Sequence, residues 1–362
     1  MVLGLLARGV ARGWGSLPRF SPWAILALLP WPLVLALHGA WMDLFKGLEF
    51  IFCLALPLWL CPGDRPAWRA CLAAFLALGL AASALGLAQA FRILPALGSE
   101  GQDRGPNGMI LAHSFFGHHN SFGAFLLGFI PLSAASAALG RRAWAMAGLA
   151  ALSAGLAALA LTFSRGSWAG LALGALAAGF LLPGRWKLIP PIGVLALALG
   201  IFALPLEQLQ MRVVSAFDDP HRAILRAIGL QVMDGYWAWG AGFGSVAREL
   251  PRRVMCLPIE GGELANMSRH LHNAYLMVLV EGGVASLAAW LCLMTSPLLL
   301  ALWAWRRGQG RAWVLAFVVA WAGIMAQSFT DLPLGYARGV GVGLCWGLML
   351  AGCLRMEGEA GA

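Results

Sequence analysis

Long apolar runs recur along the whole chain, and this feature restricts the possible folds more than any other. Many of the runs reach the roughly 20 residues that a helix needs to cross a bilayer. The composition agrees, since 60% of the residues are hydrophobic, 11% are charged and the mean hydropathy is +0.77. These values lie outside the range of soluble globular proteins. We therefore predict an all-α polytopic integral membrane protein, with residues 1–362 forming a single membrane domain.

The apolar runs predict about ten transmembrane spans. The expected spans are about 22–38, 41–61, 69–90, 119–139, 143–162, 167–182, 188–205, 273–304, 312–330 and 335–354. Every second connection is basic: Arg8, Arg12 and Arg19; Arg65 and Arg69; Arg141 and Arg142; Arg185 and Lys187; Arg306, Arg307 and Arg311; and Arg355. The positive-inside rule then puts both termini in the cytoplasm. The long hydrophilic loops 91–118 and 206–272 fall on the other face, where loops of this kind carry function.

The net charge of +9 comes mostly from arginine, because Lys46 and Lys187 are the only lysines. A GC-rich coding bias explains this composition, and a phosphate-binding role is reserved for particular arginines. The basic residues are scattered over short loops, which argues against nucleic acid as a partner. There is no nucleotide-binding P-loop, no HExxH sequence and no CxxC pair. The histidines His113, His118 and His119 lack accompanying carboxylates, so a surface cluster is expected there rather than a metal site.

A candidate general base stands where a polar loop meets a long apolar helix. His272 precedes Asn273, and the apolar run that follows contains Glu281-Gly282-Gly283. Imidazole suits proton transfer near neutral pH, and a rigid helix would hold it at the edge of the membrane. The alternative is an interfacial or helix-start residue beside an Asn273 cap. Glu281-Gly282-Gly283 is expected to end a surface helix and start the membrane helix, with Glu281 facing a cavity or a cation.

Two arginines are placed to join this histidine on the outer face. Arg165 lies in the turn 162–168 between two spans, and Arg222 lies in the large loop where a helix can start. Each could be an arginine that only snorkels to the interface. If the two converge with His272, they would neutralise a diphosphate leaving group while the imidazole deprotonates an attacking hydroxyl.

Several short motifs together resemble the O-antigen ligase and O-antigen polymerase superfamily of membrane glycosyltransferases. They are Ser-Arg-Gly-Ser-Trp at 164–168, Arg222 followed by the glycine-rich stretch 236–244, His272-Asn273-Ala274-Tyr275-Leu276 leading to Glu281-Gly282-Gly283, and the segment 119–126 that contains Asn120. Their order and intervals match over roughly residues 105–340, although each motif alone is degenerate. The glycines at 240–244 also suit a plain turn.

The resemblance implies a GT-C-type fold in the bacterial inner membrane with a periplasmic active site. The enzyme would transfer a glycan from undecaprenyl diphosphate to a hydroxyl acceptor, without metal or another cofactor. His272, Arg165 and Arg222 would be catalytic. The implied substrate-binding residues are Arg226, Asn120, Asn273, Tyr275, Glu281, Gly242 and Gly244. Because the family often has tryptophan at the position of Arg226, either Arg222 or Arg226 could be the second phosphate ligand.

The leading expectation is an O-antigen ligase that uses lipid A–core oligosaccharide as the acceptor. The nearest alternative is an O-antigen or exopolysaccharide polymerase, which extends the carrier-linked glycan. A protein O-oligosaccharyltransferase is a third variant on the same scaffold. A lipid-linked glycan transporter is the alternative from another class. Transporters commonly place ionisable residues or broken helices at mid-membrane, whereas the polar residues of this chain gather at the outer boundary.

Overall fold

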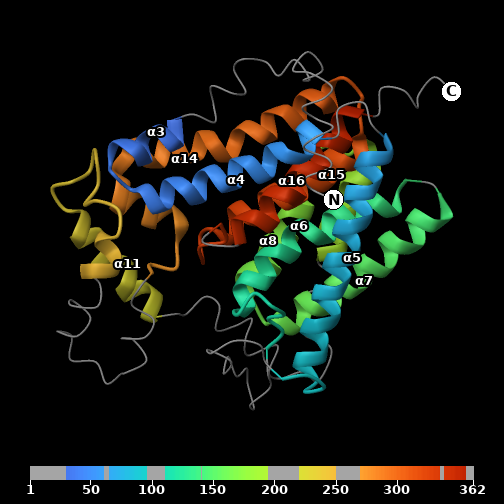
Figure 1. Cartoon of the computed structure of the whole chain (residues 1–362), viewed down its shortest axis with the longest axis horizontal. Coiled ribbons are helices and arrows are strands. Elements are labelled where there is room, and N and C mark those ends of the chain that lie inside the picture. The colour runs from blue at the N-terminus through green and yellow to red at the C-terminus, as the bar shows by residue number, and fades with distance from the viewer. Residues whose placement is uncertain are drawn as a thin grey trace.

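The computed structural model describes residues 30–60, 65–95, 111–139, 141–194, 220–249, 270–334 and 338–355. Within these ranges the chain is helical and has no strand (Figure 1). The elements are α3 (Pro30–Leu37), α4 (Trp41–Leu60), α5 (Arg65–Ala90), α6 (His119–Ala137), α7 (Arg142–Thr162), α8 (Arg165–Gly179), the short 3-10 helix η3 (Gly184–Leu188), α11 (Pro220–Met233), α14 (Ala274–Arg306), α15 (Arg311–Gln327) and α16 (Arg338–Arg355). The all-α prediction is confirmed for this part of the chain.

The apolar helices indicate a membrane protein, as expected. Among the described residues, 4 helices are long and apolar enough to cross a bilayer: Pro66–Ala90, His119–Ala137, Arg142–Thr162 and Ala274–Arg306. Arg311–Gln327 and Gly339–Leu354 are apolar but shorter. Residues 22–29 of the expected span 22–38 and residues 195–205 of the expected span 188–205 lie outside the described residues. The prediction of about ten spans therefore stays a prediction.

Helix α6 is the centre around which the other helices pack. It contacts α7, α8, α15 and α16, and Figure 1 shows it in the middle of the bundle. The most apolar stretch of α6 is 83% buried, whereas that of α7 is 33% buried. The rings of Phe122, Phe125 and Phe129 stack along one side of α6 with centroid separations of 6.4 and 5.6 Å. The beginning of α6 is therefore held firmly, which matters because Asn120 lies there.

Helices α8 and α15 cross closely because glycines face each other. A Cβ atom on Gly170 would lie 2.6 Å from the carbonyl oxygen of Gly323, so neither position leaves room for a larger residue. Small residues at a crossing let helix backbones approach and pack without hydrophobic bulk. Gly166 at the start of α8 lies against Thr330 beyond the end of α15, so the two helices are antiparallel. The crossing places Arg165 beside the segment that follows α15.

Helix α14 is broken at Gly283, and a loop from elsewhere in the chain fills the break. Gly283 has φ 71° and ψ −173°, a backbone conformation available essentially only to glycine. The amide groups of Ala241 and Gly242 donate to the carbonyls of Val280 and Glu281, at 2.8 and 2.9 Å. In return, the amide of Val284 donates to Trp237 O at 2.9 Å. Backbone groups that the break would leave unpaired are thus satisfied. The sequence-based expectation of a break at Glu281-Gly282-Gly283 is confirmed.

One end of the bundle gathers the candidate functional residues. We call it the site end and define it as the end at which α4, α6, α8, α14 and α16 begin and α15 finishes. Helix α11 lies there, against the first part of α14 (Figure 1). At the opposite end, the described connections carry arginines, among them Arg141 and Arg142 between α6 and α7. The alternation of basic connections therefore agrees with the direction of the helices.

Candidate functional site

Two arginines that are 57 positions apart in the sequence, Arg165 and Arg222, line one small cavity at the site end. We call it the arginine cavity. Its lining comes from the starts of α6, α8 and α11 and from the segment after α15: His119, Asn120, Phe163, Ser164, Arg165, Gly166, Arg222, Gln327, Thr330 and Asp331. The cavity volume is about 30 Å³, room for little more than one water molecule. Arg165 and Arg222 therefore line the same cavity, which is part of the condition that the sequence analysis set for a shared role.

The local sequence explains why Arg165 stands at a helix start. Phe163 adopts a left-handed backbone conformation with φ 50°, which ends α7. The Ser164 hydroxyl then accepts a hydrogen bond from Ser167 N at 3.4 Å and caps α8. A similar cap starts α6, where Asn120 N donates to the His118 ring at 3.1 Å. Two helix N-termini therefore adjoin the arginine cavity, and both favour a bound anion.

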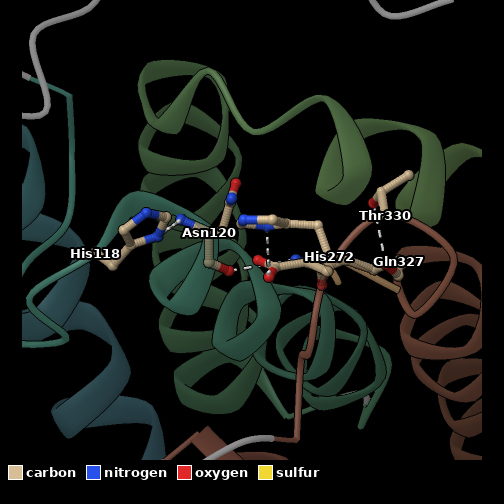
Figure 2. Close-up of polar contacts among 6 residues, drawn as sticks. His118, Asn120, His272, Gln327 and Thr330 are labelled. Atoms are coloured by element: carbon tan, nitrogen blue, oxygen red, sulfur yellow. Dashed lines mark hydrogen bonds and ion pairs between the residues drawn. The ribbon is translucent and has the colours of Figure 1, made fainter. Parts of the chain in front are cut away.

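His272 lies beside the arginine cavity and faces a carboxylate. Its Nδ1 atom is 3.9 Å from Oδ1 of Asp331, and the two side chains are 19% and 11% exposed. Figure 2 shows the His272 ring extending toward the start of α6, where Asn120 lies. His272 has φ 48°, an uncommon conformation for a residue other than glycine. Ala274 N donates to Ser328 O at 2.8 Å, which ties the segment carrying His272 to the end of α15.

Gln327 brings an amide group to the arginine cavity. Its side chain is fully buried, and its Nε2 atom donates to the carbonyl oxygen of Asn120 at 3.3 Å (Figure 2). Its Oε1 atom has no hydrogen-bond partner within the part of the chain that the structure describes. A buried acceptor is stabilised by a donor, which a water molecule or a substrate hydroxyl supplies. Gln327 thus adds a hydrogen-bond acceptor to a cavity dominated by arginine.

The structure separates the two arginines that the sequence left as alternatives. Arg222 lines the arginine cavity, whereas Arg226, one helical turn later on α11, is exposed. The Nε atom of Arg226 donates to Arg222 O at 3.1 Å. The placement favours Arg222 as the second ligand of an anion.

Other expected substrate-binding residues make structural contacts. Asn273 Oδ1 accepts from Leu276 N at 2.9 Å and caps α14, so the capping alternative that the sequence suggested is realised. The Tyr275 hydroxyl donates to Met325 O at 2.8 Å, and its ring stacks near Phe329. These bonds hold the start of α14 against α15 and so position His272.

A second and larger cavity lies at the same end, between α3, α4 and α14. We call it the aromatic cavity because Trp31, Phe50, Phe243 and Trp290 line it. Its volume is about 340 Å³, within the usual range for a ligand site. Glu281 also lines the cavity, as the sequence led us to expect of this carboxylate, and it accepts a hydrogen bond from Gly244 N at 2.9 Å.

The glycines of the loop 236–244 serve two purposes. The amide of Gly242 bonds to α14, as described above, whereas Gly244 lines the aromatic cavity. Gly240 lies so close to Glu281 that a Cβ atom would collide with its backbone. The plain-turn alternative for this stretch is therefore too simple, because the turn docks onto a broken helix.

The expected surface histidine cluster is partly wrong. His118 and His119 do lie together, with ring centroids 4.4 Å apart. His113, however, is only 3% exposed, and its Nδ1 atom lies 3.0 Å from Ser114 O. Residues 111–114 are buried, and a hydrogen bond from Gln89 Nε2 to Ser114 O at 3.2 Å joins them to the end of α5.

Sequence reasoning missed Asp331, Gln327 and Asp43 as candidate site residues. Asp331 follows an apolar run directly, and an acidic residue at such a boundary at the site end was the available signal. Gln327 gave a weaker signal as a lone amide inside an apolar helix. Asp43 lines the aromatic cavity and pairs with Lys46 at 3.2 Å.

Comparison with known proteins adds no assignment. No protein-family model matches the chain, and the comparison with curated proteins finds no match. Two guanidinium groups and two helix N-termini around one small cavity suit the binding of an anionic oxygen group such as one end of a phosphate. An imidazole beside them, facing a carboxylate, suits proton transfer to or from a hydroxyl.

Proposed function

We propose that this chain is a membrane glycosyltransferase that transfers a glycan from undecaprenyl diphosphate to an acceptor hydroxyl. The observation that carries the proposal is the meeting of Arg165 and Arg222 in one cavity beside the His272–Asp331 pair. Guanidinium groups bind diphosphate oxygens through paired hydrogen bonds, and they stabilise the charge that develops as the leaving group departs. The resemblance of the sequence motifs to O-antigen ligases and polymerases supports the same chemistry.

In the proposed mechanism each residue has a separate task. Arg165 and Arg222 hold the diphosphate, assisted by the N-termini of α6 and α8. His272 accepts the proton of the acceptor hydroxyl as the oxygen attacks the anomeric carbon. Asp331 faces the imidazole and stabilises the imidazolium that results, because opposite charges attract at 3.9 Å. The bond between the anomeric carbon and the diphosphate breaks, and the diphosphate leaves with both bonding electrons.

The proposal places the site end on the periplasmic side of the bacterial inner membrane. The arginines at the opposite end support this orientation through the positive-inside rule. Among the acceptors, lipid A–core oligosaccharide is our leading choice, which makes the protein an O-antigen ligase. A polymerase would use the same donor residues with a carrier-linked glycan as acceptor. We expect neither enzyme to need a nucleotide sugar or a metal.

The test uses purified full-length protein and undecaprenyl-diphosphate-linked glycan. One reaction contains lipid A–core oligosaccharide, and a second contains the carrier-linked repeat alone. Glycan on the lipid A–core identifies a ligase, and a ladder of longer carrier-linked glycans identifies a polymerase. Transfer in neither reaction by intact protein would contradict the proposal and favour a transporter. A chelator added to an active reaction should leave the rate unchanged, and metal-reversible inhibition would contradict the metal-free mechanism.

A further inference from the structure

Sequence neighbours of His272 and Asp331 line the aromatic cavity, and Asp331 itself lines the arginine cavity. His270 and Ala274, two residues before and after His272, line the aromatic cavity. On the facing segment, Asp331 lines the arginine cavity, and the next residue, Leu332, lines the aromatic cavity. Residues on both sides of the His272–Asp331 pair in the sequence therefore line one or the other of the two cavities. A base in this position can face a leaving group on one side and an attacking hydroxyl on the other.

The sizes of the cavities decide which of them can hold a second substrate. The arginine cavity, at about 30 Å³, has no room for a sugar in addition to a phosphate group. The aromatic cavity, at about 340 Å³, is large enough for a ligand-sized group. An attacking hydroxyl must approach the anomeric carbon from the side opposite the departing diphosphate. Of the two cavities, only the aromatic cavity is large enough for the acceptor.

The charges in the aromatic cavity argue against an anionic ligand. Asp43 and Glu281 both line it, and their carboxyl groups repel each other. Lys46 offsets part of this charge through its 3.2 Å pair with Asp43. A second diphosphate would meet the carboxylate of Asp43 and the carboxyl group of Glu281, and the repulsion between these groups and the phosphates would cost free energy. The donor's diphosphate therefore belongs with the arginines.

The same polar groups argue against a purely aliphatic ligand. A hydrocarbon chain covering Asp43, Lys46 and Glu281 would remove their hydration and offer no hydrogen bond in return. Uncharged hydroxyl groups donate to carboxylates and accept from an ammonium group, so they satisfy all three residues. Trp31 and Trp290 add broad apolar surface, against which the C–H face of a sugar ring can lie. The lining as a whole suits a polyhydroxylated group attached to an apolar one.

We propose that the aromatic cavity binds the sugar of the acceptor, and that it presents one hydroxyl of this sugar to His272. The inference rests on the proposed function and names the acceptor side of the same site. The hydroxyl proton passes to the imidazole, a bond forms between the hydroxyl oxygen and the anomeric carbon, and the carbon–oxygen bond to the diphosphate breaks. Asp43 and Glu281 orient the acceptor, and they take no part in moving the proton.

The test fills the cavity from an exposed position. Ala247 lines the aromatic cavity and is exposed, so Ala247→Trp adds an indole there without displacing core residues. Ala227 is exposed on α11 and lines neither cavity, so Ala227→Trp is the matched control. Full-length protein in nanodiscs is assayed with carrier-linked glycan as donor and lipid A–core oligosaccharide or carrier-linked repeat as acceptor.

We expect Ala247→Trp to raise the KM for the acceptor by about tenfold or more, the ratio that corresponds to losing one good contact. The KM for the donor and the slow hydrolysis of the donor by water should stay within about twofold of the wild type, as for Ala227→Trp. Asp43→Asn keeps the shape and should raise the acceptor KM severalfold. If Ala247→Trp raised the donor KM, the aromatic cavity would bind the lipid carrier. If it left the acceptor KM unchanged, the cavity would not bind the acceptor. Either result overturns the inference.

A binding measurement separates this inference from the proposed function. Soluble core oligosaccharide released from lipopolysaccharide is titrated into the wild type and both tryptophan variants by calorimetry. This measurement tests whether the aromatic cavity binds the acceptor sugar even if no transfer is observed. Binding that Ala247→Trp abolishes and Ala227→Trp preserves would support the sugar site even though the transferase proposal had failed. No binding to the wild type, together with no transfer, would overturn both.

Discussion

The two cavities at the site end differ in size, charge and construction. The arginine cavity is small and cationic. It is formed by the starts of helices and by the crossing of α8 and α15. The aromatic cavity is about ten times larger by volume, roughly 340 against 30 Å³, and carries carboxylates on an apolar wall. Its wall includes the broken part of α14 and the loop docked onto it. An anionic group is bound by fixed hydrogen-bond donors at short range, whereas a larger and less charged group needs apolar contact area and a larger cavity volume. The difference suggests two substrates with one base between them.

The largest effect should come from removing the proposed base, His272, which pairs with Asp331 of the arginine cavity. We expect His272→Ala to lower transfer by about 10²–10⁴-fold, the usual contribution of a positioned general base. His270→Ala is the matched comparison, because His270 lies on the same segment and lines only the aromatic cavity. It should mainly affect use of the acceptor. The measurement is the rate of transfer by variants with unchanged elution and thermal unfolding. Normal transfer by His272→Ala would refute the assignment of the base.

The next effect concerns the arginine cavity alone. Arg165→Lys keeps the positive charge and loses the planar fork that binds two oxygens at once. We expect a loss in transfer of about 10²-fold, comparable to removing one fixed donor from a developing negative charge. Arg226→Lys is the control, because Arg226 is exposed and lies outside both cavities. If Lys serves as well as Arg at position 165, the side chain acts as a point charge or a membrane anchor.

A smaller loss is expected from a substitution at the break in α14, beside the aromatic cavity and away from the arginine cavity. Gly283→Ala introduces a Cβ that collides with Ala238 O, at a backbone conformation reserved for glycine. We expect a loss of about 1–3 kcal/mol in stability, because the docked loop must move. The melting temperature and the acceptor KM report the change. Gly308→Ala is the control, because Gly308 has φ 74° in open space and tests backbone strain alone. Equal losses in both variants would show that the docking of the loop contributes nothing.

The smallest effect should come from the buried amide of the arginine cavity. Gln327→Met keeps the length of the side chain, but it removes the bond to Asn120 O and the acceptor Oε1. We expect a loss of about 1 kcal/mol, roughly fivefold in transfer. Gln309→Met at the opposite end of the bundle is the matched control, because Gln309 is also buried. An unchanged donor KM for Gln327→Met would remove Gln327 from the site.

The sequence predicted individual parts of the site better than their arrangement. His272, Arg165 and Arg222 were identified because charged groups next to apolar spans stand out against the membrane background. Asp331 stands in an equally conspicuous position and was missed, since nothing local links it to a histidine 59 positions earlier. Asn273 and Tyr275 were assigned to substrate because of the resemblance of the motif that contains His272. Their hydrogen bonds to α14 and α15 add a positioning role that the motif did not predict.

The all-α class, the break at Gly283 and the residue types at the site end could be predicted from local features of the sequence. Apolar length, capping residues and glycine are local signals, because each acts through the backbone within one or two turns. Only the tertiary structure decided which side chains share a cavity. The crossing at Gly170 and Gly323 brings Arg165 to Asp331, and the loop filling the break in α14 brings Gly244 to Glu281. Such contacts join residues far apart in the chain, and their geometry depends on how whole helices pack against one another.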